Sequence, residues 1–168
     1  AATVTLSART WTVPTDAIVT AKWINTPDSA TVRLAAETIS VSASPTVIVV
    51  NSTMESTIFA LVEVEGTPVD GANVTFATDA GALSSTWAIT NASGIARVNL
   101  TAGAYPTIAN VTAIWINTLG STTVSFETAT VQITASQSVI ATNSTTTSVI
   151  RANVTLSTGP VVGANVTF

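Results

Sequence analysis

A long pattern recurs in this sequence at a distance of 92 residues. The stretch "VTAKWINT" (Val19–Thr26) returns as "VTAIWINT" (Val111–Thr118), and "PVDGANVTF" at residues 68–76 returns as "PVVGANVTF" at residues 160–168. Ile39–Ala43 pairs with Val131–Ala135 at the same spacing. A repeat of this length indicates a tandem array of similar structural units.

The 92-residue period divides the chain into three parts. Residues 37–128 form one complete unit, residues 1–36 the carboxyl-terminal part of a preceding unit, and residues 129–168 the amino-terminal part of a following one. Neither partial unit contains a counterpart of Ala77–Gly94. Because the sequence begins without Met and without a basic and then apolar leader, we expect a mature or excerpted segment.

The residue types of the units predict an all-β fold. The chain holds 33 Thr and 17 Ser, and Ala, Val and Ile supply most of its apolar residues. Thr, Val and Ile are β-branched, and such side chains fit a pleated, half-buried strand better than a helix. Short runs of this kind between turn residues are typical of a β-sandwich.

Turn residues place the strands within the complete unit. Gly, Pro, Asn and Asp gather at Gly66–Gly71, Thr78–Gly81, Asn91–Gly94 and Ala102–Pro106. Between these turns, runs of apolar residues, several of them alternating with polar ones, predict strands near residues 39–43, 46–50, 57–65, 72–77, 83–90, 95–101, 108–116 and 122–133. We expect residues 1–36 to add three strands and residues 129–168 three or four.

The repeat also predicts which of two neighbouring residues, Ile114 or Trp115, points into the core. In "VTAIWINT" either Ile114 or Trp115 could point into the core, but the equivalent of Ile114 is Lys22, the single lysine. An unpaired lysine is rarely buried, so Trp115 and Trp23 are predicted to face inward. Val74, Phe76, Val98, Leu100 and Val111 are expected to share that core.

The motifs of the complete unit resemble a known family. "GTPVDGANVTFATDAGALSS", "TNASGIARVNLTAG" and "ANVTAIW" are similar to the bacterial immunoglobulin-like (Ig-like) repeats of the invasin and intimin type. The resemblance implies tandem Ig-like β-sandwiches that are exported to the cell surface and serve as a stalk, adhesin or envelope component. Receptor binding is not carried over, because the chain lacks cysteine and a separate tip module.

Asparagine is placed unusually often where a glycan can be attached. Of ten asparagines, eight open an Asn-x-Ser/Thr triplet, whereas about three are expected by chance from the Ser and Thr content. In each "NVT" the valine is predicted to face inward, which leaves Asn and Thr on the outer face. The predicted N-glycosylation sites are Asn51, Asn73, Asn91, Asn99, Asn110, Asn143, Asn153 and Asn165.

N-linked glycans would also keep this apolar chain dispersed in water. Hydrophobic residues make up 46% of it and charged residues only 8%, and large apolar patches otherwise drive association. Dense acceptor triplets, the absence of cysteine and an invasin-like repeat together indicate an archaeal surface glycoprotein.

Several functional classes are excluded by the residues. The net charge is −4 without any basic cluster, so nucleic acid is not an expected partner. No apolar run approaches the roughly 20 residues of a membrane-spanning helix. Without His or Cys we expect no catalytic residues, no cofactor and no zinc site. Asp70 and Asp79 are expected to be turn residues and not metal ligands, and Glu63 and Glu65 a solvated strand edge.

The sequence therefore predicts a non-enzymatic, extracellular protein of the cell surface. The first hypothesis is a glycosylated Ig-like array that forms a filament, sheath or S-layer, with copies of itself as partner. The alternative is an adhesin stalk or binding module of the invasin and intimin type. Because partial units rarely fold alone, either the array continues at both ends or one copy completes the next by strand complementation.

Overall fold

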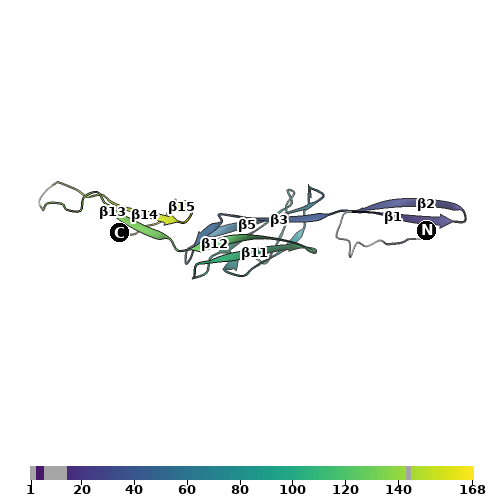
Figure 1. Cartoon of the computed structure of the whole chain (residues 1–168), viewed down its shortest axis with the longest axis horizontal. Coiled ribbons are helices and arrows are strands. Elements are labelled where there is room, and N and C mark those ends of the chain that lie inside the picture. Colours follow the sequence, from purple (N-terminus) through teal and green to yellow (C-terminus); the bar gives the residue numbers. More distant parts are fainter. Residues whose placement is uncertain (1–2, 6–14, 143–144) are drawn as a thin grey trace.

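The computed structural model of the protein describes residues 3–5, 15–142 and 145–168. This part of the chain contains fifteen β-strands and no helix, arranged in four sheets. Figure 1 shows an extended molecule with a β-sandwich at its centre, a hairpin toward the N-terminal end and a small sheet toward the C-terminal end. The all-β fold predicted from the sequence is confirmed.

Two sheets of five strands each make up the central sandwich. The first has the order β3-β5-β10-β8, with β6 paired to β5, and the second has the order β4-β12-β11-β7-β9. All pairs are antiparallel except β4 with β12. The first sheet consists of β3 (Glu37–Ser44), β5 (Glu55–Val64), β6 (Thr67–Pro68), β8 (Ala82–Leu83) and β10 (Ile95–Thr101). The second consists of β4 (Val47–Val49), β7 (Asn73–Thr78), β9 (Trp87–Ile89), β11 (Thr107–Trp115) and β12 (Thr118–Glu127).

The core lies between these sheets and follows the alternation of the strands. Side chains that point inward from both sheets form one buried cluster, because every second residue of a strand faces the same side. Trp115 is half-buried and packs against the cluster, whereas Ile114 is exposed, as the comparison with Lys22 predicted. The predicted members Val74, Phe76, Val98, Leu100 and Val111 are all confirmed, and Ile48, Ile58, Val62, Val124 and Phe126 complete the largest buried side chains.

Two predicted strands prove to be divided. The run predicted at residues 83–90 contributes β8 to the first sheet and β9 to the second, and Ser84–Thr86 cross between them. On the way, the Ser84 amide donates to Asn99 O (2.8 Å) and the Phe76 amide donates to Thr86 O (2.8 Å), so the crossing segment bonds to both sheets. A strand that changes sheets closes one corner of the sandwich.

The strand predicted at residues 122–133 is divided as well. It begins earlier, as β12 at Thr118, and ends at Glu127, and a separate strand, β13 (Thr130–Ala135), follows after two residues. β12 pairs with β11 and β4, whereas β13 pairs with β14 (Ile150–Leu156) in another sheet. The apolar alternation shifts by one residue at the break, from Val124 and Phe126 to Val131 and Ile133, and the pairing partner changes at the same place.

A smaller sheet lies toward each end of the molecule. The hairpin of β1 (Thr15–Trp23) and β2 (Thr26–Leu34) precedes the sandwich, and β13, β14 and β15 (Gly159–Pro160) follow it. The third strand expected within residues 1–36 would fall among residues that the structure does not describe. In residues 129–168, three strands are present in the described part, as expected.

Two flanking strands, β1 and β15, have the bounds that an offset of 92 residues from β11 and β6 predicts, whereas β14 begins three residues later than β5 predicts. β1 and β11 both run from Thr to Trp, and the residue that follows each of them, Ile24 or Ile116, has a left-handed φ of 55°. One prediction for these strands is wrong: Trp23 is 78% exposed. Within the described residues no second sheet covers the hairpin, so the face that is buried at Trp115 is open at Trp23.

Candidate functional site

The acidic residues singled out in the sequence do not form a site for chemistry. Asp70 and Asp79 lie in turns, as predicted, and Asp79 Oδ1 accepts a hydrogen bond from the Asn110 amide (2.7 Å). In the parts of the chain that the structure describes, no group of three or more metal-binding side chains occurs. The same residues include no helix long and apolar enough to cross a membrane.

Glu63 and Glu65 differ from the prediction of a solvated strand edge. β5 is an inner strand, between β3 and β10, and it ends at Val64. Glu65 therefore lies in the turn between β5 and β6, with a left-handed φ of 50°. From this turn its carboxylate reaches the preceding hairpin.

The first junction in the molecule joins the hairpin β1–β2 to the central sandwich. Arg33 on β2 contacts the carboxylate of Glu65 through both Nε and a terminal nitrogen, each 2.9 Å from Oε1. The Glu65 amide donates to Ala36 O in the connection between β2 and β3 (3.0 Å). One ion pair and one backbone hydrogen bond thus hold the turn of the sandwich against the segment that enters it.

The second junction joins the central sandwich to the sheet β13-β14-β15. Glu127, the last residue of β12, accepts hydrogen bonds from the Ser157 hydroxyl (2.6 Å) and from the Ser157 amide (3.0 Å). These two bonds, together with one from Ser125, stabilise the carboxylate and hold the pKa of Glu127 below its ordinary value. Ser157 lies in the turn between β14 and β15.

The two junctions use the same position of successive units. Ser157 lies 92 residues after Glu65, and both residues occupy the turn that follows the longest strand of their sheet. Each of them bonds to the last strand of the unit before it, Glu65 to Arg33 on β2 and Ser157 to Glu127 on β12.

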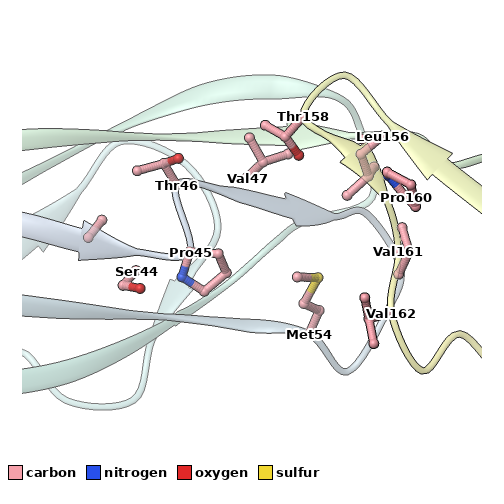
Figure 2. Close-up of a pocket in the computed structure, with 12 residues that line it drawn as sticks. Ser44, Pro45, Thr46, Val47, Met54, Leu156, Thr158, Pro160, Val161 and Val162 are labelled. Carbon is pink, nitrogen blue, oxygen red and sulfur yellow. The ribbon is translucent and has the colours of Figure 1, made fainter.

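An open groove adjoins the second junction. It has a volume of about 530 Å³ and lies between the end of the sandwich and the strand pair β14–β15. Figure 2 shows Ser44, Pro45 and Met54 on the sandwich side and Leu156, Pro160 and Val162 on the other. Apolar side chains from two units meet here without filling the space between them.

Most of the predicted glycan acceptors lie on the surface. Asn73 on β7, Asn110 on β11 and Asn153 on β14 are exposed outer-face residues, and Val74 and Val111, the middle residues of the first two triplets, are buried as predicted. Exposed acceptors outside the strands are Asn51, Asn91 and Asn165. Asn143 lies outside the described residues.

Three acceptor amides are engaged by neighbouring groups to different extents. The side-chain nitrogen of Asn51 donates a long bond to Ala104 O (3.4 Å). Asn91 accepts hydrogen bonds from the backbone amides of Ser93 (3.0 Å) and Ile95 (3.1 Å) through its side-chain oxygen. Its side-chain nitrogen, to which a glycan would be attached, takes no part in these bonds. Asn99 is half-buried on β10, and its side-chain nitrogen donates to Glu55 Oε2 (2.7 Å). Asn99 is therefore the least accessible of the described acceptors.

Sequence reasoning missed the two junction contacts. Arg33, Glu127 and Ser157 carry no motif, and Glu65 was noted only for its spacing from Glu63. The signal that could have found them is the offset itself, because Glu65 and Ser157 are polar residues at one repeat position beside a turn glycine or threonine.

Comparison with known proteins gives structural likeness only. No protein-family model matches the sequence, and no curated protein matches it. A C-terminal 282-residue fragment of intimin, solved in complex with the intimin-binding domain of the translocated intimin receptor, is 30% identical with a TM-score of 0.50. The match covers 56% of this chain and 34% of that fragment.

A second structure, the D0-D1 domain of intimin, is 26% identical with a TM-score of 0.50, and the match covers 69% of this chain and 64% of that one. The structure of invasin, a bacterial integrin-binding protein, is 25% identical over 90% of this chain and 34% of its own length, with a TM-score of 0.48. The chain thus spans about a third of the intimin fragment.

The two intimin structures define the class of fold. The central unit has the Ig-like β-sandwich fold of the invasin and intimin type, as the sequence motifs predicted. The matched structures are domains of binding proteins and not of enzymes, which favours a non-enzymatic role.

Proposed function

We propose that this chain belongs to the stalk of an extracellular surface protein of the adhesin type, in which Ig-like units follow one another end to end. The observation that carries the proposal is the pair of junctions. At each of them the last strand of one unit bonds to the turn after the longest strand of the next, through Arg33–Glu65 and Glu127–Ser157. Glu65 and Ser157 lie one period apart although their partners Arg33 and Glu127 do not, and contacts made from this one turn favour a regular linear arrangement (Figure 1).

The likeness to intimin supports the adhesin type over the filament, sheath or S-layer. The matched intimin fragment is bound to a receptor domain. Receptor recognition belongs to that protein, and since this chain spans about a third of the fragment, we place any receptor-binding surface of our protein in other units or in their loops. Location at the cell surface is part of the same proposal.

Tandem repetition with a period of 92 residues is the second part of the proposal, with units at residues 1–36, 37–128 and 129–168. It is supported by the sequence identity at that offset and by the matching limits of β1 and β11. Gly71 and Gly163, one period apart, also share a left-handed φ of 75° and 76°.

A self-assembling array is the second candidate, and the exposed apolar residues of the flanking sheets favour it. Trp23 and Ile18 on the hairpin and Val131 and Ile133 on β13 lack the burial that such residues have in a sandwich. In strand complementation the hairpin of one copy would cover β13 and β14 of another, as β11 and β12 cover β3 and β5 within the central unit.

One residue argues against that complementation in the register of the central unit. Gly120 on β12 passes so close to β3 that a Cβ atom there would lie 2.7 Å from Ile39 O. The hairpin has Asp28 at this position, and β13 has Val131 in place of Ile39. The strands would therefore have to shift apart, which favours continuing repeats over pairing between copies.

N-glycosylation of the exposed acceptors is the third part of the proposal, and an archaeal source remains an inference from the combined features. The outward Asn and Thr side chains of the triplets on β7 and β11 support N-glycosylation. A coat of glycans would shield the apolar surface of a chain with few charges.

The proposal is tested by electron microscopy of cells that produce the protein, labelled with gold-conjugated antibody against residues 37–128. A stalk should give label on projections at the outer surface, together with saturable binding of the purified protein to a target surface. Label confined to a regular lattice or filament, without saturable binding, would assign the protein to the self-assembling class. Label only inside the cells would exclude both.

A further inference from the structure

An exposed apolar stripe crosses the outer face of the second sheet of the sandwich. Trp87 and Ile89 on the edge strand β9 are 55% and 57% exposed. Ile114 on β11 and Leu119 on β12 are 40% and 60% exposed. At the equivalent position the hairpin β1–β2 has Lys22 in place of Ile114, so the fold itself does not require an apolar side chain there.

The acceptor triplet Asn73-Val74-Thr75 lies in the middle of this stripe. β7 runs between β9 and β11, with Asn73 opposite Ile89 and Thr75 opposite Trp87. On the other side Thr75 is opposite Ile114, which pairs in turn with Leu119. Both polar residues of the triplet are exposed; Thr75 has an apolar neighbour on each flank, and Asn73 has Ile89 on one.

The pairing geometry brings these side chains close together. The Thr90 amide donates to Ala72 O (2.9 Å) and the Phe76 amide donates to Thr86 O (2.8 Å). Because hydrogen-bonded and non-hydrogen-bonded pairs alternate along an antiparallel ladder, Asn73–Ile89 and Thr75–Trp87 are non-hydrogen-bonded pairs. In such pairs the side chains approach more closely, with Cα atoms about 4.5 Å apart.

We propose that an N-linked glycan on Asn73 covers this stripe, with the apolar face of its first sugar packed on Trp87 and Ile89. The inference rests on the proposed glycosylation and names the place where a glycan contributes to the folded structure. A pyranose ring presents C–H groups on one face and hydroxyls on its rim, so it can cover apolar side chains while remaining hydrated. The covalent link to Asn73 holds the first sugar beside the indole of Trp87.

The polar centre of the stripe favours a glycan over a second copy of the chain. A flat protein partner would have to bury Asn73 and Thr75 together with the apolar residues, and buried polar groups without partners are costly. A glycan is bonded to the side-chain nitrogen of Asn73, whose remaining N–H and carbonyl stay beside the hydrated sugar, and it leaves the hydroxyl of Thr75 at its edge.

Asn110 provides a matched control on the same face of the same sheet. It pairs with Thr123 on β12, and its backbone amide donates a hydrogen bond to Asp79 Oδ1 on the opposite side (2.7 Å). Asn110 is exposed, like Asn73, but its cross-strand neighbours are polar. A glycan there has no aromatic ring beside it on the strands that pair with β11.

The test uses the whole chain, secreted from a eukaryotic host and trimmed enzymatically to a single N-acetylglucosamine at each occupied site. Glycopeptide mass spectrometry measures occupancy at Asn73 and Asn110. The variants Asn73→Gln and Asn110→Gln are then compared with the parent by the indole N–H resonance of Trp87, assigned with Trp87→Phe, and by thermal unfolding. We expect only Asn73→Gln to shift the indole resonance and to lower Tm, by on the order of 2 °C or more relative to Asn110→Gln.

The double variant Asn73→Gln/Trp87→Ser separates packing from other effects, because loss of the glycan should lower Tm less once the indole is gone. If Asn73 is occupied but the Trp87 resonance is the same in the parent and in Asn73→Gln, the inference is overturned, whereas the proposed glycosylation is supported. An unoccupied Asn73 beside occupied Asn110 overturns it in the same way. If no acceptor is occupied, the proposed glycosylation fails as well. If the trimmed chain associates with itself and Trp87→Ser abolishes that association, the stripe would be assigned to a second copy instead.

Discussion

Asn99 is the described glycan acceptor whose side chain is held most firmly by its neighbours. Its nitrogen donates to Glu55 at 2.7 Å, and its oxygen accepts from Thr57 at 3.3 Å. A glycosylating enzyme would have to break the first bond and approach a half-buried residue. We therefore expect the occupancy of Asn99 to be well below that of Asn73 and Asn110, as measured by glycopeptide mass spectrometry. Equal occupancy at the three sites would show that attachment precedes folding of β10.

Gly81 and Gly71 have the same left-handed φ of +75° but different surroundings. A Cβ atom on Gly81 would clash with Thr101 O and lie 2.7 Å from Phe126 Cζ, whereas nothing lies within 4 Å of one on Gly71. Gly71→Ala should cost the backbone penalty alone, about 1–2 kcal/mol. Gly81→Ala adds about 1–3 kcal/mol for overpacking against the core.

Urea unfolding of the two glycine variants and the parent measures this difference directly. Gly71→Ala serves as the control for backbone strain, because only the space around the residue differs. Equal losses of unfolding free energy would mean that the loop at Gly81 can move away from Phe126.

Residue-level burial could be predicted from sequence where a second sheet covers one face of the strand. Alternation placed Val74, Phe76 and Val111 in the core, and the substitution of Ile114 by Lys22 showed which way Trp115 points. The same reasoning was wrong for Trp23, because burial depends on a second sheet that β1 and β2 lack in the described structure. The side to which a residue points is set by its own strand, but whether that side is buried depends on other strands.

At the level of elements, the turn residues predicted where most strands lie but not which strands pair with one another. The strand predicted at residues 95–101 matches β10 (Ile95–Thr101), because glycine and asparagine mark the start of the run. A shift of the apolar alternation between Phe126 and Val131 marks the division of residues 122–133, but the partners of β12 and β13 could not be predicted, since they are distant in the sequence. The junction contacts were missed for the same reason.

The contact between Glu127 and the turn that follows β14 should depend on pH. The hydroxyl and amide of Ser157 bond to the carboxylate and lower its pKa, so the contact stabilises the junction above the ordinary carboxyl range. It is lost as the pH falls through the lowered pKa, because a protonated carboxyl accepts these bonds poorly. We expect the Ser157 amide resonance to move in one step below the ordinary glutamate pKa.

Glu127→Gln is the matched variant for this titration, because it keeps the shape of the side chain without the ionisable group. Its Ser157 amide should show no step over the same pH range, as measured by ¹H–¹⁵N spectra. A step that persists in Glu127→Gln would come from another group, and the junction contact would then not hold in solution.

For the whole molecule, the sequence could predict that similar units repeat but not how they are oriented. Orientation depends on a few contacts at the junctions, of which Arg33–Glu65 is an exposed ion pair and Glu127–Ser157 a charged hydrogen bond. Exposed ion pairs contribute little to stability, about 0–1 kcal/mol, so we assign these contacts to the angle between units and not to folding. A stalk requires such angles to persist.

Small-angle X-ray scattering of the monomeric 168-residue chain at neutral pH tests this arrangement most directly. A compact domain of this length has a radius of gyration of about 15 Å, and an unfolded chain about 43 Å. The end-to-end arrangement in Figure 1 predicts an intermediate value and the scattering of a single elongated particle. A radius near 15 Å, with the flanking sheets folded onto the sandwich, would contradict the proposed stalk.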